Sequence, residues 1–579
     1  MPTGTIQVHT ENIFPIIKKF LYSDHEIFLR ELISNAIDAT QKLKALSSMG
    51  EFKGEIGETT IDVLLDKEAK TLTIRDRGIG MTADEIEKYI TQIAFSGAEE
   101  FVQHYKDKSD AQLIGHFGLG FYSAFMVSSS VEIFSKSYKE DSKGVRWECD
   151  GSPEYEVEET EKSERGTDIV LHIAEDSLEF LETARIKNLL KKYCKFLPVE
   201  IRFEKEIINN TQPAWTKKPS LLSENDYRLF YRELYPFADD PLFHIHLNVD
   251  YPFNLTGILY FPKLKNNFEM QKDRIQLYSN QVFVTDSVEN IVPDFLMMLK
   301  GVIDSPDIPL NVSRSYLQND ANVRKISAHI SKKVADKLED LFKTDRADFE
   351  KKWDDIRIFI VYGMLSDEKF YERAKNFCLL KTTDGKYFTF EEFAERIKPV
   401  QTDKHSKLVY LNTNDPVNQH SYVLAAKDRG YEVLQLDSPI DSHFIGFLEQ
   451  KFENASFSRV DADIIDKLVD KDDAIPSKLS KEQEEALKSL IEKVADKDLF
   501  SVSFESLGDK DAPVLITRDE FSRRMKEMSA AGGMNFMGDM KDRFNLVVNA
   551  NSSLVSKVLL EPDVARQHQL IRQSVDLAM

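Results

Sequence analysis

The amino-acid sequence predicts a multidomain protein of the α+β class, and three observations carry this prediction. The chain has 579 residues, which corresponds to roughly three to five domains of ~100–200 residues each. Hydrophobic residues make up 42% of the chain, enough for several packed cores. Patterns typical of helices and of antiparallel strands are mixed within each part of the chain, so layers of both kinds are expected to pack together.

The first predicted element is a long helix. Ser23 and Glu26 have the spacing of a capping box, and apolar residues recur from Ile27 to Ile37 on one wide face. We expect this helix to begin near Ser23 and to run to about Leu46.

Strand-like runs follow the helix. Residues 60–65 and 70–75 predict two strands, and residues 131–135 and 168–173 predict two more. The second strand stops at a turn with two glycines, residues 76–80. The first part of the chain is therefore predicted to be a layer of helices on an antiparallel sheet.

A hinge separates this part from a second mixed domain. The polar residues 209–212 and the following Pro213 indicate a boundary, so the first domain is predicted to span 1–208. The strands predicted beyond it are 243–249, 256–261, 276–277 and 282–284, the last two forming a hairpin.

A βαβ unit is predicted further along the chain. Residues 407–411 form its first strand, and Asp415 is expected to cap a helix with Pro416 at its first position. Gly430 ends that helix before a second strand at 431–436.

A second boundary lies where the composition changes. Residues 466–485 are dense in Asp, Lys, Ser and Glu, which divides the remainder into predicted domains 213–465 and 466–579. The last domain holds a cluster of five of the chain's 14 methionines: Met525, Met528, Met534, Met537 and Met540.

Charge and cysteine content exclude several classes of protein. The formal net charge of −22 repels phosphate backbones and anionic lipid, so neither nucleic acid nor a membrane is an expected partner. The 3 cysteines lack metal-ligand spacing and fit a reducing compartment. The first residues carry no basic or apolar leader, and no run approaches the ~18 apolar residues of a membrane span. We therefore expect a cytoplasmic protein.

Three polar residues lie on one face of the first predicted helix. Glu31, Asn35 and Asp38 stand at i, i+4 and i+7, so their side chains line up among apolar neighbours. By themselves, these three residues also fit an exposed polar stripe.

The turn at 76–80 has the chemistry of a purine contact. Its glycines let the backbone pass close to a flat ligand, and the Asp76 carboxylate accepts a hydrogen bond from an exocyclic amine such as that of adenine. An ordinary hairpin turn is the alternative interpretation.

A third glycine-rich segment precedes a helical pattern. Gly115, Gly118 and Gly120 lead into residues 121–125, and such a segment exposes N–H groups to a phosphate. Alone the segment is weak support, but the polar helix, the turn, the glycines and a strand opened by Gly166-Thr167 occur in this order. The spacing matches neither a P-loop nor a Rossmann unit.

The same segments resemble the heat-shock protein 90 family of chaperones, in its bacterial type. Residues 22–39, with the run EIFLRELISNA, are similar to the family signature, and residues 114–123 resemble its glycine-rich lid end. Similarity continues at 215–216, 280–284 and 309–314. The resemblance implies an N-terminal α/β sandwich ATPase of the kind shared with gyrase, histidine kinases and mismatch-repair proteins. A mixed α/β middle domain and an α+β dimerisation domain are implied to follow.

The resemblance also implies roles for the residues of the nucleotide site. Glu31 would activate the attacking water, and Asn35 would hold Mg²⁺ against the phosphates of ATP. Asp76 would bind the adenine amine, with Thr167 acting through water. The other implied contacts are Asp38, Gly80, Met81, Gly115, Gly118, Gly120 and Phe121, under a lid of about 91–120.

Residues outside the first domain are implied to complete the cycle. Arg314, with Gln318 beside it, would reach the γ-phosphate when the middle domain docks. Taken alone, Arg314 fits an ordinary surface arginine better, because arginine is common on protein surfaces. Family members are stress-response homodimers paired through the C-terminal domain. They bind unfolded or partly folded clients and act with other chaperones.

Candidate client contacts have structural alternatives. Met525 and Met528 carry adaptable thioethers suited to varied clients, but they fit the packing of a dimer core or domain interior equally well. Trp215 is predicted either to contact clients or to be a buried anchor.

Two features depart from the family pattern. Residues 88–92 replace a polar pair and a Gly-Thr before the lid, which bears on the lid's contacts with nucleotide. The chain ends at Met579 within what resembles the first helix of the dimerisation bundle, so weaker pairing is expected.

Two other functions are compatible with parts of this pattern. Another ATPase with the same nucleotide fold would need a phospho-acceptor histidine helix, a tyrosine-bearing DNA-cleavage domain or a basic DNA groove. A holdase that needs no nucleotide would coat unfolded chains with an apolar C-terminal surface.

Overall fold

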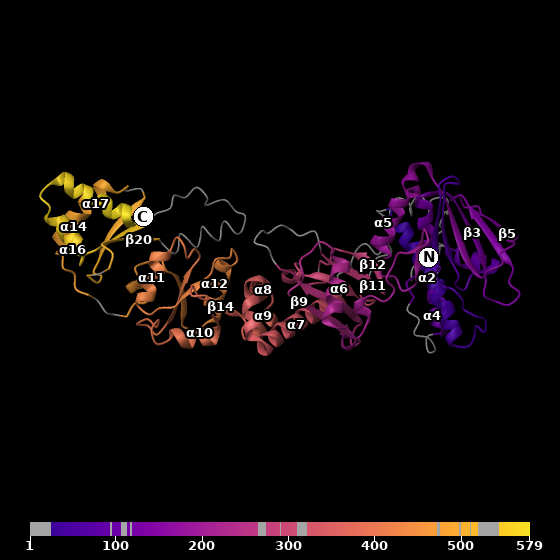
Figure 1. Cartoon of the computed structure of the whole chain (residues 1–579), viewed down its shortest axis with the longest axis horizontal. Coiled ribbons are helices and arrows are strands. Elements are labelled where there is room, and N and C mark those ends of the chain that lie inside the picture. The colour runs from indigo at the N-terminus through magenta and orange to yellow at the C-terminus, as the bar shows by residue number, and fades with distance from the viewer. Residues whose placement is uncertain are drawn as a thin grey trace, which may run out of the picture. The chain divides into compact units, whose positions relative to one another are not determined.

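The computed structural model describes residues 25–92, 95, 97–105, 113–115, 118–263, 274–289, 291–309, 321–471, 475–496, 499–509, 511–518 and 544–578. The chain divides into two compact units, Met1–Val334 and Ala335–Met579 (Figure 1). The described part of the first unit contains an eight-stranded and a five-stranded sheet, and that of the second contains sheets of two, three and three strands. Helices accompany every sheet, so the predicted α+β class is confirmed.

The eight-stranded sheet carries the predicted nucleotide site. Its strand order is β5-β4-β3-β6-β2-β1-β7-β8. The strands are β1 Ile61–Asp66, β2 Thr71–Asp76, β3 Ser128–Lys136, β4 Gly144–Cys149, β5 Glu156–Thr160, β6 Gly166–Ile173, β7 Ile201–Phe203 and β8 Glu206–Ile207. All neighbours are antiparallel except β1 and β7, and the four strands predicted from the sequence correspond to β1, β2, β3 and β6.

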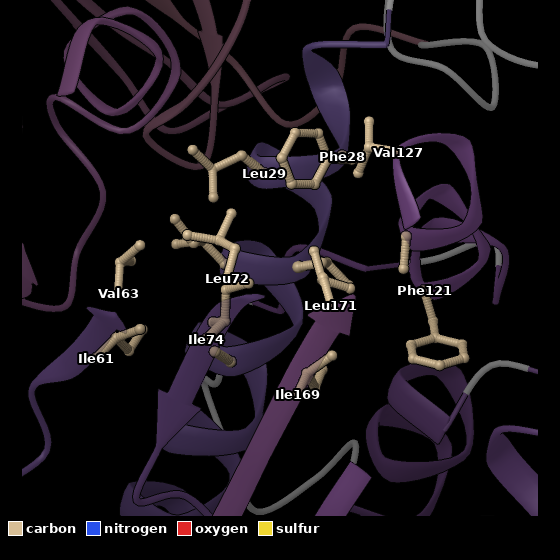
Figure 2. Close-up of a cluster of buried hydrophobic side chains, with 14 of the residues drawn as sticks. Phe28, Leu29, Ile61, Val63, Leu72, Ile74, Phe121, Val127, Ile169 and Leu171 are labelled. Atoms are coloured by element: carbon tan, nitrogen blue, oxygen red, sulfur yellow. The ribbon is translucent and has the colours of Figure 1, made fainter. Parts of the chain in front are cut away.

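The core of this domain lies between the sheet and helix α2, Ile27–Ser48. Alternate residues of β2 and β6 point toward the helix, and Figure 2 shows these side chains facing Phe28 and Leu29 of α2. Leu72, Ile74, Ile169 and Leu171 belong to this set, and each is at most 9% exposed. Burying each such side chain contributes about 1.5–3 kcal/mol, so this interface holds α2 on the sheet.

The start of α2 differs from the prediction. The helix begins at Ile27, and its N-cap Glu26 makes no side-chain cap hydrogen bond, while Ser23 lies outside the described residues. The Glu26 carboxylate instead accepts hydrogen bonds from Lys192 Nζ at 2.7 Å and from Tyr193 Oη at 3.1 Å. These long-range bonds tie the helix start to α5, Thr183–Tyr193, a contact that local sequence spacing does not reveal.

Shorter helices complete the first domain. They are α3 Ala83–Tyr89, α4 Gly97–Tyr105 and the 3₁₀ helices η3 Gly120–Met126 and η4 Glu175–Leu181. The helical pattern predicted at 121–125 is thus part of a 3₁₀ helix.

The five-stranded sheet has the order β12-β11-β13-β10-β9. Its strands are β9 Phe243–Val249, β10 Leu255–Phe261, β11 Ile275–Ser279, β12 Val282–Thr285 and β13 Lys300–Asp304. The helices in the same part of the chain are η5 Ala214–Thr216, η6 Pro219–Leu221, α6 Glu224–Leu234, η7 Asp294–Leu296 and α7 Ala321–Thr344, and the division between the two units falls within α7. The predicted hairpin is confirmed, since β11 and β12 pair antiparallel across Asn280 and Gln281, both with positive φ.

The second unit begins with two helices and a βαβ layer. Its elements are α8 Arg346–Ser366, α9 Glu368–Ala374, β14 Leu379–Lys381, β15 Tyr387–Thr389, α10 Phe390–Ile397, β16 Leu408–Thr413, α11 His420–Asp428, β17 Val433–Gln435, α12 Asp441–Lys451, β18 Ala455–Arg459 and α13 Ile465–Leu468. Strands β16 and β17 are parallel, which confirms the predicted βαβ unit. The helix starts at His420 and not at Pro416, because Asp415 caps a separate turn by accepting the N–H of Asn418.

The end of the chain forms a small α+β layer. The elements are α14 Lys481–Val494, β19 Phe500–Glu505, β20 Val514–Arg518, β21 Phe544–Asn549, α16 Ser553–Leu560 and α17 Val564–Ala578. The methionine cluster at 525–540 lies outside the described residues.

Candidate nucleotide site

The polar stripe on α2 faces the interior of the domain. Glu31 is 6% exposed and Asp38 is 5% exposed, while Asn35 between them is half-buried. The alternative of an exposed polar stripe is therefore wrong. Buried polar groups require partners, and each of the two carboxylates has them.

Glu31 is held by the arginine that precedes it. Arg30 is 1% exposed, and its Nε and Nη2 atoms lie 3.0 and 2.9 Å from Glu31 Oε1. Arg30 Nη1 also donates to the carbonyl oxygen of Phe283 at 3.3 Å, which orients the guanidinium from outside the sheet domain. Arg30 was not predicted from the sequence, because its partner at Phe283 is distant along the chain.

Asp38 binds the protein backbone. Its Oδ1 accepts the N–H of Ile114 at 2.7 Å, and its Oδ2 accepts the N–H of Gly115 at 2.7 Å. Asp38 was predicted to contact nucleotide, and both of its oxygens here tie α2 to the glycine-rich segment. Direct contact between Asp38 and a nucleotide stays a prediction.

Two of the three predicted glycines pass close to the polar stripe. A Cβ atom on Gly115 would lie 3.0 Å from Asp38 Oδ2 and 3.9 Å from Asn35 Oδ1. A Cβ atom on Gly120 would lie 3.1 Å from Glu31 Oε2. The third glycine, Gly118, has φ +61° and approaches the backbone of Phe95. The absence of side chains at Gly115 and Gly120 therefore keeps space open beside the stripe.

Aromatic residues form the wall behind the glycines. Phe121 is 7% exposed and lies edge-to-face with Trp147 at a centroid distance of 5.7 Å. Figure 2 shows Phe121 in the same cluster of buried side chains as Ile169 and Leu171 of β6. Phe121 therefore belongs to the core that borders the site.

The Asp76 turn has a buried carboxylate. Asp76 is 5% exposed, and its Oδ1 accepts the N–H of Gly78 at 2.8 Å. Burial raises the pKa of Asp76 to about 7, with a smaller increase from the charge of Asp168. Gly80 has φ +60°, and a Cβ there would lie 1.9 Å from the carbonyl oxygen of Lys136, so this position requires glycine.

Arg165 braces the same turn from outside. Its Nε donates to the Gly78 carbonyl oxygen at 3.0 Å, and its Nη2 donates to the Ile56 carbonyl oxygen at 2.7 Å. Both atoms also contact the Arg77 carbonyl oxygen, at 3.3 and 3.2 Å. Arg165 was not identified from the sequence, because a single arginine before Gly166-Thr167 carries no local pattern.

A row of three polar residues crosses the sheet at the level of Asp76. Thr167 of β6 is paired with Asp76 of β2 on one side and with Ser135 of β3 on the other. Ser135 was also not predicted, although the sequence contains a signal for it. Every second residue of this strand, at 131, 133 and 135, faces the core, and only the last of these three is polar. Met81 is half-buried, and its N–H donates to Ser135 Oγ at 2.8 Å.

The segment before the lid packs on α4. Lys88 Nζ and Tyr89 Oη lie 2.7 and 2.9 Å from carboxylate oxygens of Glu100. The segment 88–92, which differs from the family pattern, therefore forms hydrogen bonds with Glu100 of α4. Within the predicted lid, residues 93–94, 96, 106–112 and 116–117 lie outside the described residues.

Trp215 is a buried anchor and not a surface contact. Its side chain is 1% exposed, and its ring lies edge-to-face with Phe196 at 4.8 Å. Its Nε1 donates to Asp304 Oδ2 at 3.2 Å. The client-contact interpretation of Trp215 is therefore corrected, since a fully packed indole is not available to a partner.

Four other predicted residues lie outside the described residues: Arg314, Gln318, Met525 and Met528. Within the ranges that the structure describes, no helix is long and apolar enough to cross a membrane.

The residues present fit a nucleotide with Mg²⁺. No group of three or more His, Cys, Asp or Glu side chains in the described part of the chain is arranged to hold a metal ion unaided. Mg²⁺ usually binds through one or two protein oxygens together with phosphates and water. The Asn35 amide oxygen, beside the open space at Gly115, is suited to that arrangement.

Comparison with known proteins defines first the class and then the family. Residues 22–174, which contain the stripe, the turn and the glycines, match the family model "Histidine kinase-, DNA gyrase B-, and HSP90-like ATPase". The protein is therefore an ATPase of this class. Residues 198–577 match the model "Hsp90 protein", which covers more than half of the chain.

Curated relatives agree with this assignment. The chain is 58% identical to "Chaperone protein HtpG" of Bacteroides thetaiotaomicron over 585 residues, covering 98% of this chain and 85% of the relative. It is 56% identical to the protein of that name from Porphyromonas gingivalis strain W83, covering 96% and 84%. It is 33% identical to that of Desulfitobacterium hafniense, covering 91% and 87%. The chain belongs to the Hsp90 family of ATP-dependent chaperones.

Proposed function

We propose that this chain is an ATP-driven clamp that binds non-native or metastable client proteins and alternates between open and closed dimers. The observation that supports it most directly is the buried Asp76 carboxylate, which lies in one row with Thr167 at the end of the sheet. This acceptor fits the amine of adenine. The polar stripe of α2 and the nearby glycines fit the phosphates.

Each residue of the stripe has a distinct task in this proposal. Asn35 holds Mg²⁺, which when bound offsets the charge of the phosphates. Glu31 orients and deprotonates the attacking water, and Arg30 keeps the Glu31 carboxylate in place through the contacts at 3.0 and 2.9 Å. Asp38 keeps the glycine-rich segment against the helix through its two backbone bonds.

Turnover is proposed to depend on a second domain. The proposed domains are 1–208 for ATP binding, with a lid at about 91–120, 213–465 as the middle domain, and 466–579 for dimerisation. Arg314, with Gln318, would supply positive charge to the γ-phosphate when the middle domain docks. An arginine in that role is worth ~10³–10⁵ in rate in other phosphoryl-transfer enzymes.

The proposed partners are client proteins, a second copy of the chain and other chaperones, in the cytoplasm. Exposed apolar side chains on the terminal helices support pairing, since Leu560 is 78% and Leu577 is 88% exposed. Met525 and Met528 are proposed as client contacts because thioether side chains adapt to varied surfaces.

Calorimetry and turnover assays test the proposal together. Asp76→Asn should abolish the heat of ATP binding, because the amide replaces one acceptor oxygen with a donor. Glu31→Ala should preserve ATP binding and lower turnover by ~10²–10⁴. Glu68→Ala, which removes an exposed carboxylate, is the matched control and should behave as the unaltered chain.

Client protection in the same variants separates a clamp from a holdase. A clamp with Glu31→Ala should fail to release and re-bind clients in cycles. A holdase that needs no nucleotide would keep its full activity in this variant, and that result would contradict the proposal.

A further inference from the structure

The polar row across β2, β6 and β3 is buried at the end of an otherwise apolar sheet face. Asp76 is 5%, Thr167 is 6% and Ser135 is 0% exposed. Residues directly opposite one another on neighbouring strands project from the same face, so the three side chains lie side by side. Polar groups buried in this way must satisfy one another or a ligand.

The hydrogen bonds of the row have a direction. The N–H of Met81 can only donate, and it donates to Ser135 Oγ at 2.8 Å. The Ser135 hydroxyl has one proton left to give, and Thr167 Oγ1 lies at 2.9 Å whereas the Gly166 carbonyl oxygen lies at 3.4 Å. Either hydroxyl can donate in the Ser135–Thr167 pair, and donation from Ser135 to Thr167 uses the shorter of the two bonds open to the Ser135 proton.

This direction determines what Thr167 can offer to a ligand. When Thr167 Oγ1 accepts the proton of Ser135, its own proton is available to the next group. The row then presents an acceptor at Asp76 and a donor at Thr167. Adenine presents the complementary pair, a 6-amino donor and the N1 acceptor, whereas guanine presents O6 as acceptor and N1–H as donor.

We propose that Ser135 is a positioning residue that fixes Thr167 as a hydrogen-bond donor toward the base, directly or through one water, and so favours adenine over guanine. One water preserves this direction, since it accepts the proton of Thr167 and donates its own to N1. The inference rests on the proposed ATP site and assigns to Ser135 a part of its selectivity. Met81 takes part through its backbone N–H, so any residue except proline can perform this task at that position.

The test compares ATP with 1-deaza-ATP, which keeps the 6-amino group and replaces N1 by a C–H group. Affinities of both nucleotides are measured by calorimetry on the full chain and on Ser135→Ala. The unaltered chain should prefer ATP by about tenfold or more, as expected for one buried hydrogen bond. In Ser135→Ala this preference should fall to about two- to threefold. The affinity for ATP should decrease, whereas the affinity for 1-deaza-ATP should stay nearly unchanged. Affinity for GTP should fall less than affinity for ATP.

Two further variants make the result specific. Ser135→Thr keeps the hydroxyl and should restore the preference. Thr167→Val removes the donor itself and should abolish the preference, after which adding Ser135→Ala should change it no further. If Ser135→Ala does not fold, Ser135→Cys is measured in its place, because a thiol is a weaker donor and should reduce the preference in part.

Two outcomes overturn the inference. An equal loss of affinity for both nucleotides in Ser135→Ala would mean that the hydroxyl only supports the fold. An unaltered chain that binds ATP without preferring it to 1-deaza-ATP would remove the role of Thr167 as donor. In both cases the ATP site would stand, whereas failure of the unaltered chain to bind ATP would overturn the proposed function itself.

Discussion

Three carboxylates of the first domain have the same chemistry and different surroundings. Glu31 is paired with a buried guanidinium, Asp38 accepts two backbone N–H groups, and Asp76 accepts the backbone N–H of Gly78 in a buried position. Burial raises the pKa of Asp76 to about 7, so its protonation should respond to physiological changes of pH.

Binding of the base should therefore weaken in acid. The ionised Asp76 accepts the adenine amine, and its pKa of about 7 lies above the usual value of 3.8. As pH falls below about 7, protons compete with the ligand, and the Kd should rise about tenfold per pH unit, while it stays flat above that pH. Adenosine is the suitable ligand because it has no phosphate that titrates in this range.

A matched variant checks the origin of this dependence. Asp168 adds negative charge that raises the pKa of Asp76, so Asp168→Asn should move the midpoint to lower pH. The measurements cover about pH 5 to 8, which spans about two units below and one unit above the midpoint. A constant Kd for adenosine over this range would contradict the prediction.

Arg165 should affect binding more than chemistry. Arg165→Lys keeps the charge but cannot bridge the carbonyl oxygens of Gly78, Arg77 and Ile56. We expect the KM for ATP to rise about tenfold and kcat to change by less than about threefold, as for the loss of a charged hydrogen bond that acts on ground-state binding. Steady-state kinetics measure both.

Arg146→Lys is the control for this substitution. Arg146 lies on β4 and pairs with Glu132 and Glu158 in the same sheet. Its replacement should leave the KM unchanged, and a similar rise of KM in both variants would indicate a general loosening of the sheet.

At the scale of elements, the turn between β2 and α3 is built around a close approach of two backbones. A Cβ on Gly80 would lie 1.9 Å from the Lys136 carbonyl oxygen, whereas Gly57, with a similar φ of +67°, has no atom within 4 Å of such a Cβ. The two positions have the same backbone requirement and differ only in space. Substitutions at Gly57 and Gly80 therefore separate the cost of backbone strain from the cost of a steric clash.

Gly57→Ala should lower the free energy of unfolding by about 1–2 kcal/mol, the cost of the left-handed conformation alone. Gly80→Ala should lower it further and should also weaken ATP binding, because the turn must move away from β3. Urea unfolding and ATP titration of both variants measure the difference. Equal effects on unfolding would mean that the turn relaxes without difficulty.

The link between α2 and the glycine-rich segment is a second element-scale feature. In Asp38→Asn one side-chain oxygen remains to accept the N–H groups of Ile114 and Gly115. The new NH₂ group is a donor, so it faces one of these two N–H donors without forming a hydrogen bond. Hydrogen exchange of these two amides should become about 10–100-fold faster. The exchange of amides in β6 serves as the internal reference and should not change.

At the scale of the whole molecule, the chain folds as two compact units. Trp215 and Asp304 stabilise the first unit from within the five-stranded sheet domain, so this tryptophan contributes to folding. The second unit carries the exposed apolar side chains of α16 and α17. Its surface is therefore the place to test pairing.

Substitutions on the terminal helices should reduce dimerisation. Leu577→Asp places a charge on a side chain that is 88% exposed, and in a pairing surface this should raise the dimer Kd about tenfold or more. Leu221→Asp, at a side chain 73% exposed in the first unit, is the control and should leave pairing unchanged. Sedimentation velocity with and without a non-hydrolysable ATP analogue measures pairing and closure. Equal sedimentation of both variants and of the unaltered chain would exclude α17 from the pairing surface.

Local patterns determined much of this protein. The alternation of apolar residues predicted β2 and β6, the glycines at 78 and 80 predicted the turn, and Glu31, Asn35 and Asp38 predicted a polar face on α2. These features depend on residues a few positions apart, whose periodicity and turn chemistry are visible in the sequence. The predicted start of α11 at Pro416 is wrong because Asp415 caps a separate turn. The predicted start of α2 near Ser23 is wrong because the helix begins at Ile27, where the Glu26 side chain binds Lys192.

Only the tertiary structure decided how the buried polar groups are paired. Ser135 meets Thr167 through strand register, Arg165 reaches Gly78 and Ile56 across a turn, and Trp215 is enclosed by residues from several elements. Such pairings join positions that are far apart along the chain, so no local spacing encodes them. They form because a polar group removed from water must find a partner wherever the folded chain brings one.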